Sequence, residues 1–193
     1  MTLSALGIFS AAGAGGAAVA GAYELISTTI VSGTATTSVT FSSLGDYSSA
    51  YKHLQIRAVV RSAKAAQNSD SVFMRLNGDG GNNYSRHELY AEGTGTVGAY
   101  AATSQSAFYI SQPPAANATA NNFNASVTDI LDAYSTTKNK TKRTMFGSTG
   151  VNLIDLASGA WLNTASITTI AFTLSSTDKF LAGSRFSLYG IRG

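Results

Sequence analysis

His53-Leu54-Gln55-Ile56-Arg57-Ala58-Val59-Val60-Arg61 is the stretch that decides the fold of this 193-residue chain. Apolar residues occupy every second position from Leu54 to Val60, and polar residues fill several of the positions between them. Successive side chains of a β-strand point to opposite faces, so a period of two predicts a strand with one buried face. We therefore expect Leu54, Ile56, Ala58 and Val60 to lie in the core of a sheet.

The rest of the chain predicts similar short strands, separated by clusters of turn-forming residues. The densest cluster is Asn77-Gly78-Asp79-Gly80-Gly81-Asn82-Asn83, whose residues favour turns and tolerate positive φ. No segment repeats apolar residues at helical spacing over three turns. We expect an all-β fold, an antiparallel β-sandwich of the jelly-roll kind. The expected strands cover residues 24–31, 39–41, 53–61, 72–76, 84–90, 107–110, 123–131, 144–146, 151–156, 167–174 and 185–191.

Two of the intervening regions are predicted as loops and one as a turn. Gly93, Gly95 and Gly98 mark a loose loop, residues 115–122 form a polar loop, and residues 138–143 form a basic turn. The strand over residues 123–131 is expected to bury the side chains of Phe123, Ala125, Val127 and either Ile130 or Leu131.

The composition excludes several classes of function. Charged residues make up 12% of the chain, against about 25% in an average globular domain. The net charge of +3 comes from 13 basic and 10 acidic residues, whereas a nucleic-acid-binding face is more densely basic. The chain has no cysteine, so it has no disulfide, thiol nucleophile or cysteine-ligated metal. We expect no nucleic-acid partner and no cofactor.

Residues 1–22 are uncharged and rich in alanine, glycine and serine. A signal peptide requires a basic n-region, and a membrane span requires about 20 strongly apolar residues. We therefore expect no membrane span and predict an extended N-terminal arm that orders on a partner, with residues 23–193 forming the body. A terminus without a docking role and a membrane element are the alternatives. The expected docking residues are Leu3, Leu6, Ile8 and Phe9.

No nucleophilic or metal centre is predicted. The two histidines, His53 and His87, lie in amphipathic strand-like runs, and no Gly-x-Ser-x-Gly elbow is present. We expect both histidines at surface or cross-strand positions. Residues 77–83 supply side-chain oxygens but only one carboxylate, so a plain turn is favoured over a calcium site.

Two pairs of carboxylates are candidates for glycoside hydrolysis, which needs two acids facing one another. Asp129 and Asp132 are three residues apart and fall on opposite faces of a strand. Glu88 and Glu92 share a face only if their strand runs through Ala91. A non-enzymatic protein is the favoured interpretation, and a glycan-cleaving spike is kept as a rival.

The only dense run of charge is Lys138-Asn139-Lys140-Thr141-Lys142-Arg143. In a strand, Lys138, Lys140 and Lys142 would share one face. A solvated hairpin is the favoured interpretation. The alternative is that these lysines and Arg143 contact an acidic protein partner or a surface glycan. Trp161 lies between two apolar residues and is expected in the core.

Five segments together are similar to a known family. They are Tyr51–Arg57, Arg75–Asp79 with Asn83–Tyr90, Asp129–Asp132 running into Lys138–Thr141, Ser158–Thr164 and Gly183–Ile191. In these segments the chain resembles a family of uncharacterised structural proteins of tailed bacteriophages, especially cyanophages and other aquatic phages. The resemblance implies a capsid- or tail-associated virion component and supplies no catalytic residues.

The expected function is therefore a capsid decoration (cement) or head-surface protein on the virion surface, assembled in the host cytoplasm and docked through its arm. Other virion proteins are the expected partners, and a symmetric homo-oligomer such as a trimer is the expected state. The alternative is a tail or collar fibre module that binds a host glycan through Tyr100, Tyr109 or Tyr134, taken to lie on loops.

Overall fold

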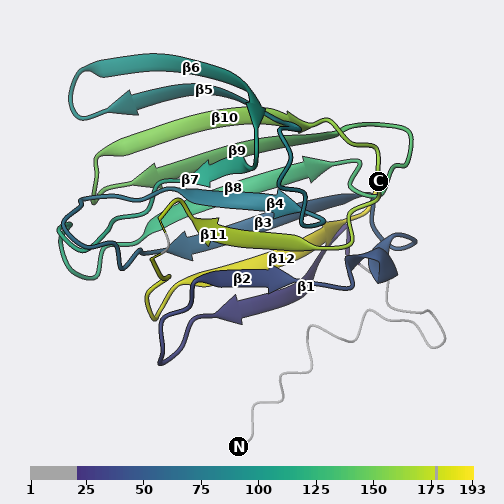
Figure 1. Cartoon of the computed structure of the whole chain (residues 1–193). Coiled ribbons are helices and arrows are strands. Elements are labelled where there is room, and N and C mark those ends of the chain that lie inside the picture. The colour runs from purple at the N-terminus through teal and green to yellow at the C-terminus, as the bar shows by residue number, and fades with distance from the viewer. Residues whose placement is uncertain (1–20, 177) are drawn as a thin grey trace, which may run out of the picture.

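The computed structural model describes residues 21–176 and 178–193. These residues form two antiparallel sheets that pack against one another, with one short 3-10 helix, η1 (Leu44–Tyr47) (Figure 1). No helix in this part of the chain is long and apolar enough to cross a membrane. The strands are β1 (Tyr23–Ile30), β2 (Ser38–Phe41), β3 (His53–Val60), β4 (Val72–Leu76), β5 (Tyr84–Glu92), β6 (Thr96–Gln105), β7 (Phe108–Ser111), β8 (Asn124–Leu131), β9 (Lys140–Ser148), β10 (Leu153–Trp161), β11 (Ile170–Leu174) and β12 (Arg185–Ile191).

The strand order contains a jelly roll. The smaller sheet has the order β2-β11-β4-β7, and the larger sheet begins with β1-β12-β3-β8. Along the chain these eight strands change sheet at every step except from β4 to β7, which are neighbours in the smaller sheet, and this is the strand order of a jelly roll. The predicted all-β antiparallel sandwich is therefore confirmed.

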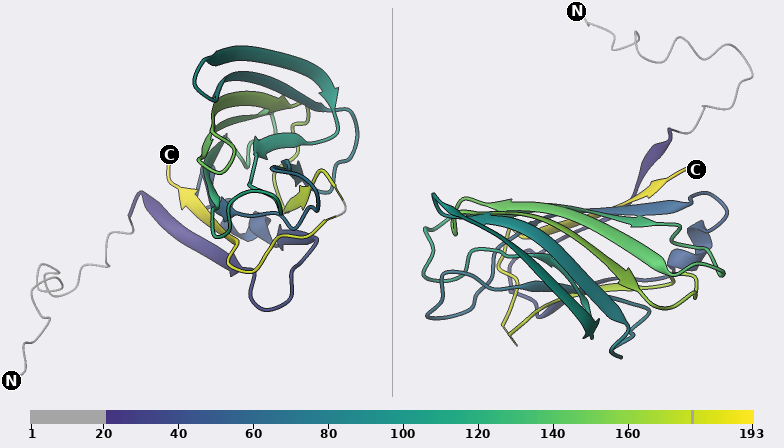
Figure 2. Two further views of the ribbon diagram at one scale, coloured as in Figure 1. Left: turned by 90° about the vertical axis from the view of Figure 1, so that its left-hand side faces the viewer. Right: turned by 90° about the horizontal axis from the view of Figure 1, so that it is seen from above.

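Two further hairpins extend the larger sheet. The hairpin β9–β10 follows β8 in the chain, and the hairpin β5–β6 connects β4 to β7. They continue the larger sheet beyond β8 in the order β9-β10-β5-β6. Figures 1 and 2 show that β5 and β6 extend the larger sheet past the edge of the smaller sheet. We call these four strands the hairpin extension.

The core lies between the two sheets of the jelly roll. Leu54, Ile56, Ala58 and Val60 of β3 are all buried, as predicted. They belong to one apolar cluster with the phenylalanines of β11 and β12, and the ring of Phe172 lies 4.9 Å from that of Phe186. Burial of this continuous cluster is the main favourable term in folding.

An aromatic cluster joins the hairpin extension to the jelly roll. Trp161 at the end of β10 is opposite Tyr84 at the start of β5, with ring centroids 6.3 Å apart. Phe108 of β7 packs edge-on against Tyr84 at 4.9 Å. The Trp161 indole Nε1 donates a hydrogen bond to Asp79 Oδ2 at 2.7 Å. Trp161 is 1% exposed, which confirms its predicted place in the core.

The expected loop around Gly93, Gly95 and Gly98 is partly wrong, because strand β6 begins at Thr96 and includes Gly98. Gly98 is opposite Tyr90 of β5. A Cβ on Gly98 would lie 2.6 Å from the Tyr90 ring. The glycine therefore makes room for an aromatic ring on the neighbouring strand, and it does not mark the end of a strand.

The predicted buried face of β8 is also wrong. Asn124, Ser126 and Thr128 are buried, whereas Ala125 is exposed and Val127 is half-buried. The buried side chains find polar partners: the Thr128 and Thr144 hydroxyls are hydrogen-bonded at 2.9 Å. Only Ile130 of the predicted set is fully buried, because the interior beside β9 is polar.

Trp161→Phe should lower the free energy of unfolding by about 1–3 kcal/mol, because the Asp79 carboxylate loses its indole donor. Urea denaturation of both proteins measures the difference. Leu162→Ala is the matched control, since the neighbouring Leu162 is 60% exposed, and it should change stability by less than about 0.5 kcal/mol. Equal losses in the two variants would contradict the role assigned to Trp161.

Candidate functional site

The outer face of the hairpin extension carries apolar side chains exposed to solvent. Leu89, Leu156 and Met145 are directly opposite one another on β5, β10 and β9, and each is more than half exposed, at 54%, 52% and 54%. Ile154 on β10 is 55% exposed. Two cross-strand rows form what we call the apolar face: Ala99-Leu89-Leu156-Met145-Val127 and Val97-Ala91-Ile154-Gly147-Ala125.

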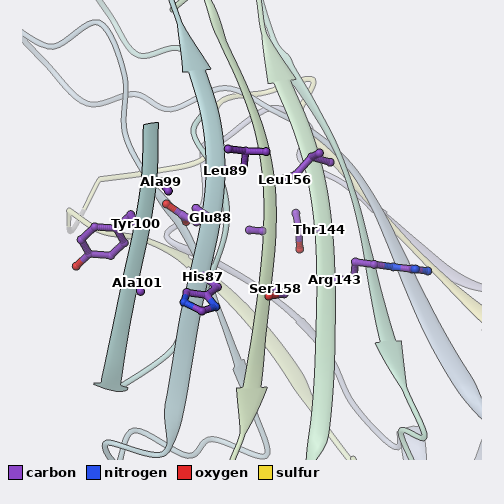
Figure 3. Close-up of a pocket in the computed structure, with 11 residues that line it drawn as sticks. His87, Glu88, Leu89, Ala99, Tyr100, Ala101, Arg143, Thr144, Leu156 and Ser158 are labelled. Carbon is purple, nitrogen blue, oxygen red and sulfur yellow. The ribbon is translucent and has the colours of Figure 1, made fainter. Parts of the chain in front are cut away.

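One side of the apolar face is bordered by a polar row. His87, Ser158, Arg143 and Asp129 are successive cross-strand partners on β5, β10, β9 and β8, and Arg143 Nη2 donates to Asp129 Oδ2 at 3.1 Å. A shallow groove of about 670 Å³ runs between the polar row and the apolar face. In Figure 3, Leu89 and Leu156 lie side by side on neighbouring strands, with His87 and Ser158 below them.

The apolar residues face outward because the alternate positions of the same strands are polar and face inward. In β9 the buried residues are Lys140, Lys142, Thr144, Phe146 and Ser148. Met145 lies between two of them and must point to the opposite face. The hairpin extension therefore reverses the usual arrangement, in which a strand hides its apolar side.

The predicted surface role of Lys140 and Lys142 is wrong, because both side chains are fully buried. The Lys142 Nζ donates to the backbone carbonyl of Tyr109 at 2.8 Å, and burial lowers the pKa of Lys142 to about 8. Burial also lowers the pKa of Lys140. The Lys140 Nζ donates to three loop carbonyls, those of Ser135, Lys138 and Thr164.

The other two residues of the basic run are exposed but apart. Lys138 Nζ pairs with Asp132 Oδ2 at 2.7 Å in the turn before β9, and Arg143 pairs with Asp129 on the outer face. The four basic side chains do not form one cationic surface. Their binding of an acidic partner or glycan remains a prediction for Lys138 and Arg143 alone.

The remaining predicted residues are distributed as follows. His53 Nδ1 accepts a hydrogen bond from the backbone N–H of Asp132 at 2.8 Å, and His87 is exposed on the outer face. The Asp79 carboxylate accepts bonds from Trp161, Asn83 and Gly81, so residues 77–83 form a hydrogen-bonded turn. Within residues 21–176 and 178–193, no group of three His, Asp or Glu side chains is placed to hold a metal ion.

The docking residues predicted for the N-terminal arm lie outside the described residues. Leu3, Leu6, Ile8 and Phe9 are among residues 1–20, and the first strand begins at Tyr23.

The inner face of the hairpin extension contains buried charges. Arg86 and Glu88 of β5 form a bidentate ion pair in which Arg86 Nη2 lies 2.6 Å from Glu88 Oε2. The Arg86 guanidinium lies 3.8 Å from the centroid of the Tyr109 ring and 4.9 Å from that of Tyr100. Asp155 of β10 is 3% exposed. These five residues line a cleft of about 310 Å³, together with Tyr90, Glu92, Gln112 and Leu153.

Burial raises the pKa of Asp155 to about 6, with a further contribution from the negative charge of Glu88. Burial also raises the pKa of Tyr109 above its ordinary value. The charged neighbours of Asp155 are Arg86 and Glu88 from β5 and Lys142 from β9. Perturbed titratable groups in a cleft are a physical indication of a ligand or reaction site.

Sequence reasoning identified this carboxylate cluster only in part. Glu88 and Glu92 were predicted to share a face only if their strand ran through Ala91. Strand β5 does continue through Ala91, and both glutamates line the cleft. Asp129 and Asp132 belong to separate ion pairs. Asp155 is not among the residues predicted from the sequence. The pattern that could have identified it is a single carboxylate among apolar residues, in Leu153-Ile154-Asp155-Leu156.

Comparison with protein-family models, with curated proteins and with solved structures finds no match for this chain. The fold is therefore established by the structure, and the resemblance to tailed-phage structural proteins stays a prediction. Fold alone does not carry a function. The functional argument depends on the apolar face and the cleft.

Asp155→Asn tests the buried carboxylate through the pH dependence of stability. Because the folded-state pKa of about 6 exceeds the ordinary value of 3.8, the contribution of Asp155 to the stability of the unaltered chain should fall as pH rises from about 4 to about 6. At pH 7 the variant should be the more stable by on the order of 2–3 kcal/mol, and this gain should vanish near pH 4. Denaturant unfolding at both pH values measures it.

The matched control is Asp46→Asn in the exposed η1 helix, which should leave the stability profile unchanged. A gain for Asp155→Asn of equal size at pH 4 and pH 7 would contradict a buried, titrating Asp155.

Proposed function

We propose that the chain is a non-enzymatic structural protein of a tailed-phage virion, a decoration protein of the head surface. The observation that carries the proposal is the apolar face, which extends over five strands with no charged side chain in either row. The largest apolar patch on a typical monomer covers roughly 300–600 Å² and is often an interaction surface. The phage assignment itself comes from the resemblance of the five segments.

We assign a second copy of this chain as the occupant of the apolar face. At ordinary β spacings, five strands and two rows cover roughly 24 by 14 Å, or about 340 Å². A stable protein pair buries about 800 Å² on each partner, with an apolar core and a polar rim. The apolar face supplies such a core, and the His87-Ser158-Arg143-Asp129 row supplies part of the rim.

The charge pattern favours self-association over a strongly charged partner. The polar row contains both signs, and its Arg143 and Asp129 already neutralise one another. An uncharged apolar surface is complementary to another of the same kind, and every copy of the chain carries one. Most soluble oligomers are symmetric assemblies of one chain.

A head-surface position is favoured over a tail fibre by the shape of the body. The described residues form one jelly roll with a hairpin extension, and the sequence has no fixed-period repeat of the kind that builds a long shaft. Jelly rolls occur in viral capsid proteins and in lectins, which supports the proposal as a fold-level analogy only.

Leu156→Asp should dissociate the proposed oligomer, because each interface would then bury an unpaired carboxylate. Sedimentation equilibrium at micromolar concentration should give two or three chain masses for the unaltered protein and one for the variant. Leu25→Asp is the control: Leu25 is 56% exposed on β1, at the far edge of the same sheet, and the variant should keep the oligomer. A monomeric unaltered protein would sink the self-association proposal.

Quantitative peptide mass spectrometry of purified phage particles should find this chain at a copy number comparable to that of the major capsid protein. Such a ratio distinguishes decoration of a shell, whose sites repeat over the whole head, from a tail component present in few copies. A copy number typical of tail proteins would overturn the head-surface assignment. Absence from purified particles would overturn the virion assignment.

A further inference from the structure

The cleft and the apolar face lie on opposite sides of the sheet, although Glu88 and Tyr100 line both the cleft and the groove beside the apolar face. Arg86, Glu88 and Asp155 point to the inner side of β5 and β10, whereas Leu89 and Leu156 point to the outer side. Tyr100 of β6 is opposite Glu88, and Tyr109 of β7 comes from the smaller sheet. Three strands of the larger sheet and one of the smaller sheet therefore build the cleft.

An unpartnered buried atom marks the cleft as a binding site. Asp155 is 3% exposed, and its Oδ1 is fully buried with no hydrogen-bond partner among the described residues. A buried acceptor that lacks a donor costs about 1–3 kcal/mol. Asp155 also lines the cleft, so a ligand bound there can bring a hydrogen-bond donor to this carboxylate group.

The walls offer both hydrogen-bond acceptors and an aromatic surface. Glu88 is held in place by Arg86, while Glu92 at the end of β5 is exposed. Tyr100 is 48% exposed, so part of its ring is available to a ligand. The guanidinium of Arg86 lies against both Tyr100 and Tyr109 and keeps the two rings in place.

The chemistry of the cleft excludes several ligand classes. Three carboxylates, Glu88, Glu92 and Asp155, line it and would repel an anion. An apolar ligand would leave the Asp155 carboxylate without a donor. Arg86 and Lys142 lie close to these carboxylates, so the cleft attracts an organic cation less strongly than three unpaired carboxylates would.

A neutral saccharide is a ligand class that these arguments leave, and its chemistry fits the cleft. Its hydroxyl groups donate hydrogen bonds to carboxylate oxygens, and its apolar C–H face packs on a tyrosine ring. A volume of about 310 Å³ lies at the small end of ligand pockets. We propose that this cleft binds one neutral sugar residue; its walls are formed by Arg86, Glu88, Tyr100, Tyr109 and Asp155. The Asp155 carboxylate accepts a hydrogen bond from a sugar hydroxyl, and the Tyr100 side chain packs against the sugar ring.

Sugar binding in the cleft is independent of the proposed structural role, which depends on the apolar face. The two tyrosines were expected on loops, but they lie on β6 and β7 and meet at Arg86. Tyr134, the third expected tyrosine, is in another region beside Tyr51 and Lys138. The saccharide site is therefore built from strands, which hold their side chains more rigidly than loops do.

Saturation-transfer-difference NMR with D-glucose, D-galactose, D-mannose and N-acetyl-D-glucosamine, each at millimolar concentration, tests the proposal on the full chain. Spermidine is included as an organic cation. At least one sugar should bind, and Tyr100→Ala and Asp155→Asn should each weaken its affinity about tenfold or more. Glu92→Gln is a second carboxylate variant, at an exposed position that also lines the cleft.

Tyr23→Ala is the matched control, because Tyr23 is a partly exposed tyrosine of β1 that also lies under an arginine, Arg57, at 5.2 Å. This variant should bind the sugar as the unaltered chain does. Binding of spermidine alone, binding of none of the four sugars, or unchanged affinity in both cleft variants would overturn the proposal. Leu156→Asp should still bind sugar, so failure of the oligomer and failure of the sugar site are distinguishable.

Discussion

The polar interior beneath β8, β9, β10 and β5 is the constraint on which the rest of this structure depends. Side chains of a strand alternate between two faces, so a strand with polar groups at its buried positions must present the intervening residues to solvent. The Thr128 and Thr144 hydroxyls are hydrogen-bonded to one another on the buried side of the sheet. The Lys142 Nζ donates a hydrogen bond to the backbone carbonyl of Tyr109. The apolar face follows from this arrangement, since Met145, Ile154 and Leu156 have no other side to occupy.

Buried charges are an expensive way to fill an interior. Replacing a buried ion pair by apolar side chains of similar volume is often neutral or stabilising. Arg86, Glu88, Lys142 and Asp155 nevertheless lie together, and Asp155 has an oxygen without a partner. The jelly roll itself has an ordinary apolar core, so the fold does not require these charges. Their concentration in the hairpin extension indicates that this region is adapted to binding more than to stability.

The sequence predicts most of the jelly roll well but predicts β8 and the hairpin extension poorly, for one physical reason. In β3 the period of two coincides with hydrophobicity, so Leu54 and Ile56 are correctly placed in the core. In β8 and β9 the side chains also alternate with a period of two, but this alternation does not show which of the two faces is buried. Val127 was therefore placed inside and Lys140 outside, the reverse of the structure. Asp155 was missed because its pairing with β5 joins segments more than sixty residues apart.

The alternation that creates the two surfaces also keeps them independent. Leu89 and Glu88 are neighbours in β5, yet one belongs to the apolar face and the other to the cleft. A second copy seated on the outer face would contact the backbone of the strands that line the cleft without entering it. The aromatic cluster of Trp161, Tyr84 and Phe108 fixes these strands to the jelly roll. If the chain assembles through one side of its hairpin extension as proposed, the cleft on the other side stays formed, so assembly and ligand binding would not compete.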